Sequence, residues 1–276
     1  MSSKPFLKWP GGKYRLVERI CKELGPGKRL IEPFIGSGAV FLNSPYDKFL
    51  LADNNADLIN LYNTLHQEGD SFIEYARGFF LPECNNADAY YSFRAVFNNT
   101  NDIRLKAALF IYLNRHCYNG LCRYNGSGGF NSPFGRYKNP HFPEQTMQAF
   151  IEKSKHATFI SSDFKTTMLK ARKGDVVYCD PPYTPLSKTA NFTGYSTGGF
   201  GWDKQEELAT LAQKLASKGI RVVISNHNTP EIRKLYEDAK ITSFHVQRFI
   251  SQDKNNRKKA AELIAVFDNN LDGVES

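Results

Sequence analysis

The chain has 276 residues, a length that suits one large domain or a core domain that carries an insertion. Its formal net charge of +8 favours a polyanionic partner. No stretch approaches the ~20 apolar residues of a transmembrane helix and no apolar leader follows Met1, so we expect a cytoplasmic protein without a membrane anchor. The five scattered cysteines favour reduced thiols and argue against a zinc site.

Short apolar runs with polar residues at their carboxyl ends alternate with helical patterns. This alternation predicts an α/β fold with a mainly parallel, doubly wound sheet. Ligands of such sheets bind outside the carboxyl ends of the strands, so the polar residues there are the first candidates for a site. The runs that we interpret as strands cover residues 29–31, 49–52, 157–160, 175–179 and 221–224.

Two helices and two further strands complete this pattern. Leucines at helical spacing follow Asn54 and Asn55, which we expect to cap the first helix. In the second helix, residues 208–215 carry the apolar face, with Asp203 as the expected cap. The apolar stretches 241–246 and 263–267 are expected to pair as added edge strands.

The segment from about residue 63 to residue 142 breaks the alternation. It contains a helical stretch at 105–113, followed by residues 118–139, which are rich in Gly, Asn, Arg and aromatic side chains. We interpret the segment as an inserted subdomain.

The tetrapeptide Asp180-Pro181-Pro182-Tyr183 follows the apolar run 175–179. Each proline fixes its own φ, and Pro181 also favours an extended Asp180. The result is a stiff corner with a carboxylate, the Pro181 carbonyl and an aromatic face. Two acceptors suit the hydrogens of an exocyclic amine on a flat ring, and they favour a more pyramidal nitrogen that can attack a methyl group.

A turn between the first strand and a helix predicts a cofactor site. It reads Glu32-Pro33-Phe34-Ile35-Gly36-Ser37-Gly38, and Asp53 stands seventeen residues after Gly36, where an acid can bind ribose hydroxyls. Phe34 fits a pyrophosphate poorly and better suits S-adenosylmethionine. In the N-terminal segment, Lys13 can pair with a carboxylate and Trp9 can face a cation.

Together these motifs resemble the Dam family of DNA adenine N6-methyltransferases, the alpha group. The resemblance runs from about Phe6 to Phe267. It rests on the order of Lys-Trp-x-Gly-Gly-Lys, Glu-Pro-Phe-x-Gly-x-Gly, Ala-Asp, a recognition insert, Asp-Pro-Pro-Tyr and Ile-Ser-Asn-His. The insert matches in Tyr118–Asn125, Phe130-Asn131 and Pro133–Tyr137, whereas Gly126–Gly129 at a hairpin tip is more glycine-rich than the family pattern.

The resemblance implies a Rossmann-like methyltransferase sheet with an inserted, mainly helical target-recognition subdomain that carries a β-hairpin. Residues 1–62 and 146–276 are then the two parts of the catalytic domain, and residues 63–145 are the insert. The implied catalytic residues are Asp180, Pro181, Pro182 and Tyr183, of which the acid and the Pro181 carbonyl bind the target amine and Tyr183 stacks on the base. The implied contacts of S-adenosylmethionine are Trp9, Lys13, Phe34, Gly36, Asp53, Asp163, Phe164 and Asp180.

The family's target implies methylation of adenine in double-stranded GATC after the base is flipped out, by direct transfer and without a metal. A monomer acting on nucleoid or phage DNA is expected. Arg123 suits a bidentate contact with guanine, Leu121 and Pro133 suit thymine methyls, and Tyr118 suits the space left by the flipped base. The full set of expected DNA-binding residues is Lys8, Tyr118, Asn119, Leu121, Arg123, Asn125, Asn131, Pro133, Arg136 and Tyr137.

Three alternatives stay open at this point. An exocyclic-amine methyltransferase with another target, such as cytosine N4 or RNA, would share most motifs, although cytosine enzymes favour Ser in place of Asp180. A DNA-binding regulator without catalysis would keep the fold. A nicotinamide oxidoreductase is disfavoured by the bulk of Pro33 and Phe34.

Overall fold

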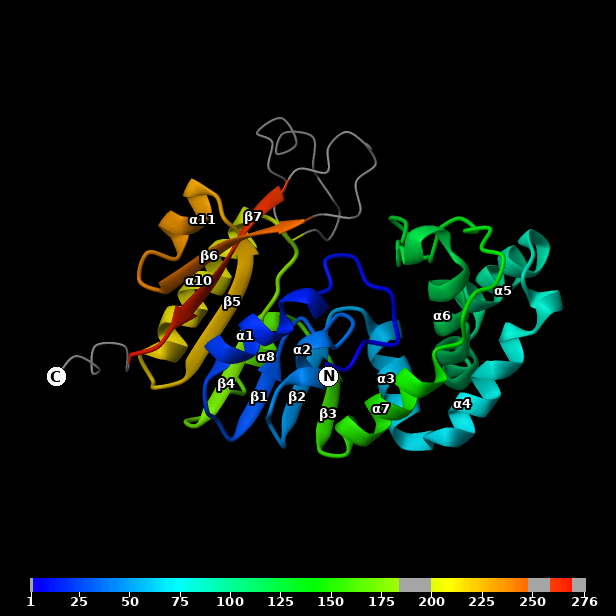
Figure 1. The fold of residues 1–276 in the computed structure, drawn as a ribbon, viewed down its shortest axis with the longest axis horizontal. Helices are drawn as coiled ribbons and strands as arrows, with labels where there is room; N and C mark the ends of the chain where they lie inside the picture. Colours follow the sequence, from blue (N-terminus) through cyan, green and yellow to red (C-terminus); the bar gives the residue numbers. More distant parts are fainter. Residues whose placement is uncertain (1, 184–199, 248–258, 270–276) are drawn as a thin grey trace. The chain divides into compact units, whose positions relative to one another are not determined.

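The computed structural model describes residues 2–183, 200–247 and 259–269. Packing divides the chain into two compact units, and Figure 1 shows the elements of both. The first unit comprises residues 1–18 and 35–162, and the second comprises residues 19–34 and 163–276. The predicted division into 1–62, 63–145 and 146–276 follows function rather than packing, and it stays a prediction.

Five strands of the second unit lie side by side in one sheet (Figure 1). The first three in spatial order are parallel, whereas β7 is antiparallel to both of its neighbours. The two added strands expected at the end of the chain are therefore confirmed. In spatial order the strands are β1 (Arg29–Glu32), β4 (Asp175–Cys179), β5 (Arg221–His227), β7 (Lys259–Phe267) and β6 (Lys240–Gln247).

The centre of this sheet is buried on both faces. Every residue of β4 is buried, as is all of β5 after Arg221. Helix α10 (Trp202–Ala216) contacts β5 and β7, and its leucines Leu208, Leu211 and Leu215 are buried. The expected Asp203 cap is wrong, because the helix begins at Trp202 and Gly201 holds the cap position without a side-chain hydrogen bond. The other helices of this region are α1 (Val17–Leu24), α8 (Phe164–Met168) and α11 (Pro230–Leu235).

The first unit joins a strand pair to a group of helices. Strands β2 (Phe49–Asp53) and β3 (Ala157–Ser161) are parallel. The Asn55 side chain caps α3 as expected, by accepting a hydrogen bond from the Leu58 N–H. The helices of this unit are α2 (Ala39–Asn43), α3 (Ala56–Glu68), α4 (Asp70–Arg77), α5 (Ala87–Asn99), α6 (Ile103–His116) and α7 (Glu144–Ser154).

An aromatic cluster forms the core of the first unit. The Tyr62 and Phe150 rings stack with centroids 4.8 Å apart, and Phe6 meets both rings edge-on. Since Phe6 lies in the N-terminal segment and Phe150 in α7, this cluster fixes the two ends of the unit against α3. Aromatic pairs of this geometry are worth about 0.5–1.5 kcal/mol each beyond the area that they bury.

Residues 117–134 form an irregular hairpin after α6. Two isolated antiparallel bridges, Cys117 with Phe134 and Tyr124 with Phe130, replace a regular ladder. The expected hairpin is therefore present, but two isolated bridges hold its strands together instead of a continuous ladder of hydrogen bonds. The short 3₁₀ turn Tyr118–Gly120 opens it, with Asn119 in the left-handed region at φ 53°.

The architecture is α/β, doubly wound and Rossmann-like, with a mainly helical insertion. Within the described ranges, no helix is both long enough and apolar enough to span a membrane.

Candidate active site

The Asp180–Tyr183 corner stands at the carboxyl end of β4. Pro181 is buried, whereas Asp180 and Tyr183 are half-buried. The buried Gln205 amide of α10 donates to the Pro182 carbonyl at 3.1 Å and accepts from the Asn226 amide at 3.0 Å. This relay from the end of β5 fixes the second half of the corner. Asn226 lies in the Ile-Ser-Asn-His motif, whereas no sequence pattern indicated Gln205.

Tyr183 is held between two acidic side chains and a histidine. Its ring lies 4.3 Å from the His227 ring, nearly edge-on at 61°. Its hydroxyl donates to Glu262 at a long 3.5 Å. Burial raises the pKa of Tyr183 well above its usual value, and the nearby carboxylates of Asp180 and Glu262 raise it further. The tyrosine therefore stays neutral, and the corner is rich in hydrogen-bond acceptors.

The turn after β1 is fixed from several sides within the first unit. The Gly36 N–H donates to the Asp53 carboxylate at 3.1 Å, and the Gly36 carbonyl accepts from the Tyr62 hydroxyl at 2.6 Å. Gly36 has φ +47°, and a Cβ there would lie 2.9 Å from Trp9 Nε1. Glycine is therefore required by both the backbone angle and the indole packed against it.

Asp53 ends β2 and is bonded to backbone. Besides Gly36, the Asn55 N–H donates to it at 3.0 Å. Burial raises the pKa of Asp53, and the backbone donors oppose that rise. Lys13, which the sequence predicts as a cofactor contact, is buried and donates to the Gly11 carbonyl at 2.9 Å, within the N-terminal segment.

The aromatic rings of Phe34 and Phe164 lie side by side in the second unit. Their rings stack with centroids 5.6 Å apart and an interplanar angle of 21°. Phe200 packs against both rings, with centroids 5.5 Å from each. Phe200 was not expected from the sequence, because it lies far from either partner along the chain. The cluster offers apolar faces of the kind that suit a purine ring.

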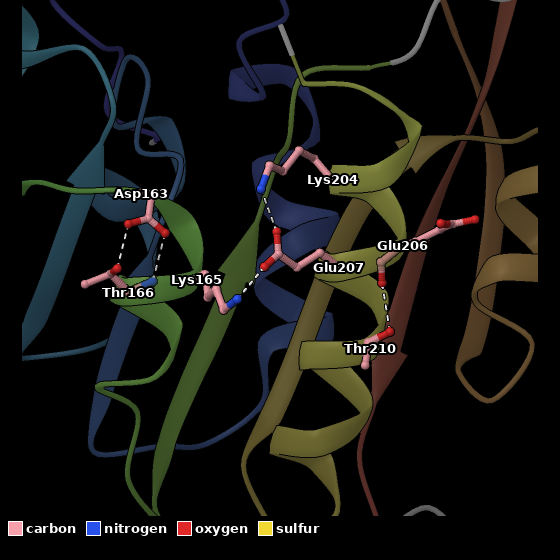
Figure 2. A network of polar contacts seen from close by, with 7 residues as sticks. All are labelled: Asp163, Lys165, Thr166, Lys204, Glu206, Glu207 and Thr210. Atoms are coloured by element: carbon pink, nitrogen blue, oxygen red, sulfur yellow. Dashed lines mark hydrogen bonds and ion pairs between the residues drawn. The ribbon is translucent and has the colours of Figure 1, made fainter. Parts of the chain in front are cut away.

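Asp163 caps α8, as Figure 2 shows. Its carboxylate accepts from the Thr166 N–H at 3.0 Å and from the Thr166 hydroxyl at 2.6 Å, and these bonds lower its pKa. The same view shows Lys165 and Lys204 both paired with Glu207. The pair with Lys165 joins α8 to α10. Asp163 is exposed and holds the helix start that carries Phe164, while its predicted cofactor contact stays a prediction.

The expected DNA-binding residues all fall in the first unit, in the N-terminal segment, in the hairpin and just after it. Arg123 is exposed, and its Nε donates to the Asn131 side chain at 2.9 Å, which fixes the guanidinium plane. The Asn125 side chain accepts from the N–H groups of Ser127 and Gly129 and so shapes the glycine-rich tip. Tyr118 is 53% exposed, as an intercalating ring would need to be.

Three more of these residues meet at the 3₁₀ turn. The Asn119 N–H donates to the Tyr137 hydroxyl at 2.9 Å. The Lys8 ammonium lies 4.4 Å from the centroid of the Tyr137 ring. Leu121 and Pro133 belong to the hairpin, and Arg136, just after it, is exposed with a left-handed φ of 53°.

Comparison with known proteins identifies the family. Residues 9–250 match the D12 class N6 adenine-specific DNA methyltransferases. The chain belongs to this family. A DNA adenine methylase from Serratia marcescens is 50% identical over 266 residues, which cover 96% of this chain and 98% of the relative. A DNA adenine methylase from Escherichia coli K12 is 48% identical over 265 residues, with 96% and 95% covered.

Solved structures add little to this D12-class assignment. A precorrin 8W decarboxylase from Methanobacterium thermoautotrophicum matches with a TM-score of 0.36 and 12% identity, covering 96% of this chain and 97% of its own. A likeness at that level supports no argument about function.

As a D12-class protein, the chain is a DNA adenine N6-methyltransferase. The corner after β4 places hydrogen-bond acceptors beside an aromatic ring. No three His, Cys, Asp or Glu side chains among the described residues gather in a group that could hold a metal ion.

Proposed function

We propose that this D12-class enzyme transfers the methyl group of S-adenosylmethionine to adenine N6 in double-stranded GATC, after flipping the adenine out of the helix. The observation that carries the proposal is the corner itself. It joins the Asp180 carboxylate to a neutral, fixed Tyr183 ring at the carboxyl end of a central strand. Ligands of doubly wound sheets bind at this edge.

The cofactor assignment is supported by the chemistry of the predicted residues. S-adenosylmethionine carries ribose hydroxyls, an adenine ring and no phosphate. Asp53 is a carboxylate that can accept from hydroxyls, and the bulk of Phe34 and Phe164 suits an adenine better than a pyrophosphate. The Gly36 turn leaves no room for a side chain. When bound, the cofactor supplies a methyl group on a sulfonium sulfur, an electrophile that needs no protein nucleophile.

The corner residues act on the target amine. Asp180 and the Pro181 carbonyl accept the two N6 hydrogens, which orients the nitrogen and stabilises the positive charge that develops on it. One proton then leaves N6 for solvent, and the product is neutral N6-methyladenine. His227 holds the Tyr183 ring in place and needs no role as a base.

Base flipping is proposed because an adenine stacked in a duplex hides its amine from any protein carboxylate. Extrusion costs a few kcal/mol. Stacking on an aromatic side chain returns about 1–3 kcal/mol of that cost, and Tyr183 offers the ring for it. The exposed Tyr118 ring can occupy the space that the base leaves.

The GATC target is proposed from the hairpin residues. Arg123 is exposed, and its plane is fixed by Asn131, which prepares its fork for the O6 and N7 atoms of guanine. Leu121 and Pro133 are the candidates for thymine methyl contacts. Asn119, Asn125, Asn131, Arg136 and Tyr137 are proposed to position the phosphates and bases.

The test uses purified full-length protein, S-adenosylmethionine and two short duplexes, one with GATC and one with the same bases scrambled. Mass spectrometry would quantify N6-methyladenine and N4-methylcytosine in each product. We expect N6-methyladenine in the GATC duplex alone. Equal methylation of both duplexes would remove the sequence assignment, and N4-methylcytosine in place of N6-methyladenine would overturn the choice of base.

A further inference from the structure

Three asparagines of the first unit use the same device. Each side-chain amide bonds both the N–H and the carbonyl of one residue far along the chain, as a neighbouring strand would. Asn43 holds Ser3 at 2.7 and 2.9 Å, and Asn98 holds Phe130 at 2.8 and 3.1 Å. Asn114 holds Lys8 at 2.9 and 2.7 Å, across 106 residues.

Asn114 differs from the other two in its burial and its further contacts. It lies in the last turn of α6 and is 0% exposed, whereas Asn98 is exposed and Asn43 is half-buried. Its amide nitrogen also lies 3.3 Å from the Cys122 sulfur and 3.5 Å from the Gly120 carbonyl. One side chain thus reaches the N-terminal segment, the last residue of the reading turn, Tyr118–Gly120, and Cys122 just after it.

The Lys8 stem packs directly against that turn. A Cβ on Gly120 would lie 2.4 Å from Lys8 Cβ and 2.7 Å from Lys8 Cδ, so only glycine lets the two backbones approach this closely. At its other end, Lys8 meets the ring of Tyr137, whose hydroxyl accepts from the Asn119 N–H. The position of Lys8 and the shape of the turn therefore depend on each other.

From this geometry we propose that Asn114 is a positioning residue for target recognition. It holds the Lys8 backbone against the Tyr118–Gly120 turn, so that sequence discrimination depends on a buried amide that does not itself touch DNA. The proposal rests on the proposed DNA-reading role of the hairpin. Burial of the amide makes its bonds costly to lose, since the Lys8 N–H and carbonyl would be left without partners away from water.

Asn114→Leu tests the proposal, with Asn43→Leu as its matched control. Both substitutions remove a two-bond bracket on one backbone residue, but only the first lies beside the reading turn. The readout is the ratio of kcat/KM on a GATC duplex to kcat/KM on a duplex with one base pair of the site changed. We expect Asn114→Leu to lower this ratio roughly 5- to 150-fold, the range of one good base contact. Asn43→Leu should lower the melting temperature and leave the ratio unchanged.

A second pair of variants disturbs the same junction without touching the buried amide. Gly120→Ala forces a methyl group into the Lys8 stem, whereas Gly219→Ala adds a methyl group at a similar φ of +72° with no atom within 4 Å. The first should lower the discrimination ratio, and the second should not. This pair decides the question if Asn114→Leu does not fold.

The outcomes separate the two proposals. A wild-type enzyme that methylates both duplexes equally would refute the target assignment itself. The role of Asn114 would be overturned if the wild type discriminates between the duplexes and Gly120→Ala keeps the wild-type ratio, as does Asn114→Leu where that variant folds. The proposed function would then stay intact. A loss of ratio in the Asn43→Leu control would show that any loss of stability lowers discrimination, and that result would also overturn the role of Asn114.

Discussion

The corner after β4 and the turn after α6 are fixed by different means. The corner is stiff within its own sequence, because two consecutive prolines limit the backbone between Asp180 and Tyr183, and the distant Gln205 adds one bond to the Pro182 carbonyl. The turn is fixed from a distance, through the Asn114 bracket on Lys8 and the bond from Asn119 to Tyr137. A stiff local motif suits chemistry, which needs one arrangement of acceptors. A turn held by distant residues suits recognition, because those residues set where its exposed side chains lie.

This difference predicts that changes in the corner affect turnover and that changes in the turn affect target choice. The largest effect is expected for Asp180→Ala, which removes the carboxylate proposed to orient the amine. Turnover should fall roughly 10²- to 10³-fold, as for loss of one preorganised group at a developing charge. Single-turnover methylation of the GATC duplex would measure it, with Asp203→Ala as the control for loss of one acidic side chain in the same unit. Near-normal turnover in Asp180→Ala would contradict the assignment.

The next largest effect concerns Arg123 in the hairpin. Arg123→Ala should cost about 1–3 kcal/mol of discrimination at one base pair while retaining turnover on the best substrate. Arg123→Lys is the informative companion, because lysine keeps the charge but loses the planar fork. Competition between the GATC duplex and single-substituted duplexes measures both. If the lysine variant discriminated as well as wild type, charge rather than a bidentate contact would explain the role of Arg123.

A smaller effect is expected at Tyr183, where ring and hydroxyl can be separated. Tyr183→Ala should lower kcat/KM roughly tenfold, within the range for loss of one base-stacking contact. Tyr183→Phe keeps the ring against His227 and loses the contacts of the hydroxyl with the Glu262 and Asp180 carboxylates, so an enzyme that needs only the ring should stay close to wild type. A phenylalanine variant as slow as the alanine variant would show that the hydroxyl, and not stacking, is needed.

The strands and the corner could be predicted from sequence because their signals are local. Apolar runs place β1, β2, β3, β4 and β5, and Asp180–Tyr183 is contiguous. The Asp203 cap failed for a local reason as well, since the helix begins one residue before the acid. Helix ends vary by one or two residues, so a sequence pattern places a cap less securely than the helix itself.

The supports of the site could not be predicted, because their partners are far apart in the chain. Gln205 reaches the carbonyl of Pro182, and Asn114 reaches Lys8, through amides that leave no periodic pattern. Phe200 joins Phe34 and Phe164 only in the folded chain. An asparagine side chain in a helix can form several different hydrogen bonds, and the folded chain determines which backbone groups lie within its reach.

The last prediction concerns His116, beside the turn, and the loss of unfolding free energy in acid. His116 ends α6 and is 1% exposed, with its ring 3.9 Å from the Tyr112 ring. Its Nδ1 bonds the Tyr112 carbonyl, so Nδ1 carries the hydrogen. Burial, helped by the Lys8 charge and opposed by the hydrogen bond to the Tyr112 carbonyl, lowers the pKa of His116 to about 4. The Gly135 N–H donates to the His116 carbonyl, which links this residue to the hairpin.

A lowered histidine pKa means that the folded state holds its proton less readily than the unfolded state. Its contribution to stability is therefore complete above pH 6.5 and is lost as the pH falls towards 4, at up to about 1.4 kcal/mol per pH unit. His116→Gln should be less stable than wild type at pH 7, because the ring contacts are lost, but its unfolding free energy should fall less steeply with acid. Denaturant unfolding from pH 7 to pH 4 measures both slopes. Equal slopes would mean that another group titrates in this window and that the hairpin is not anchored by a neutral His116.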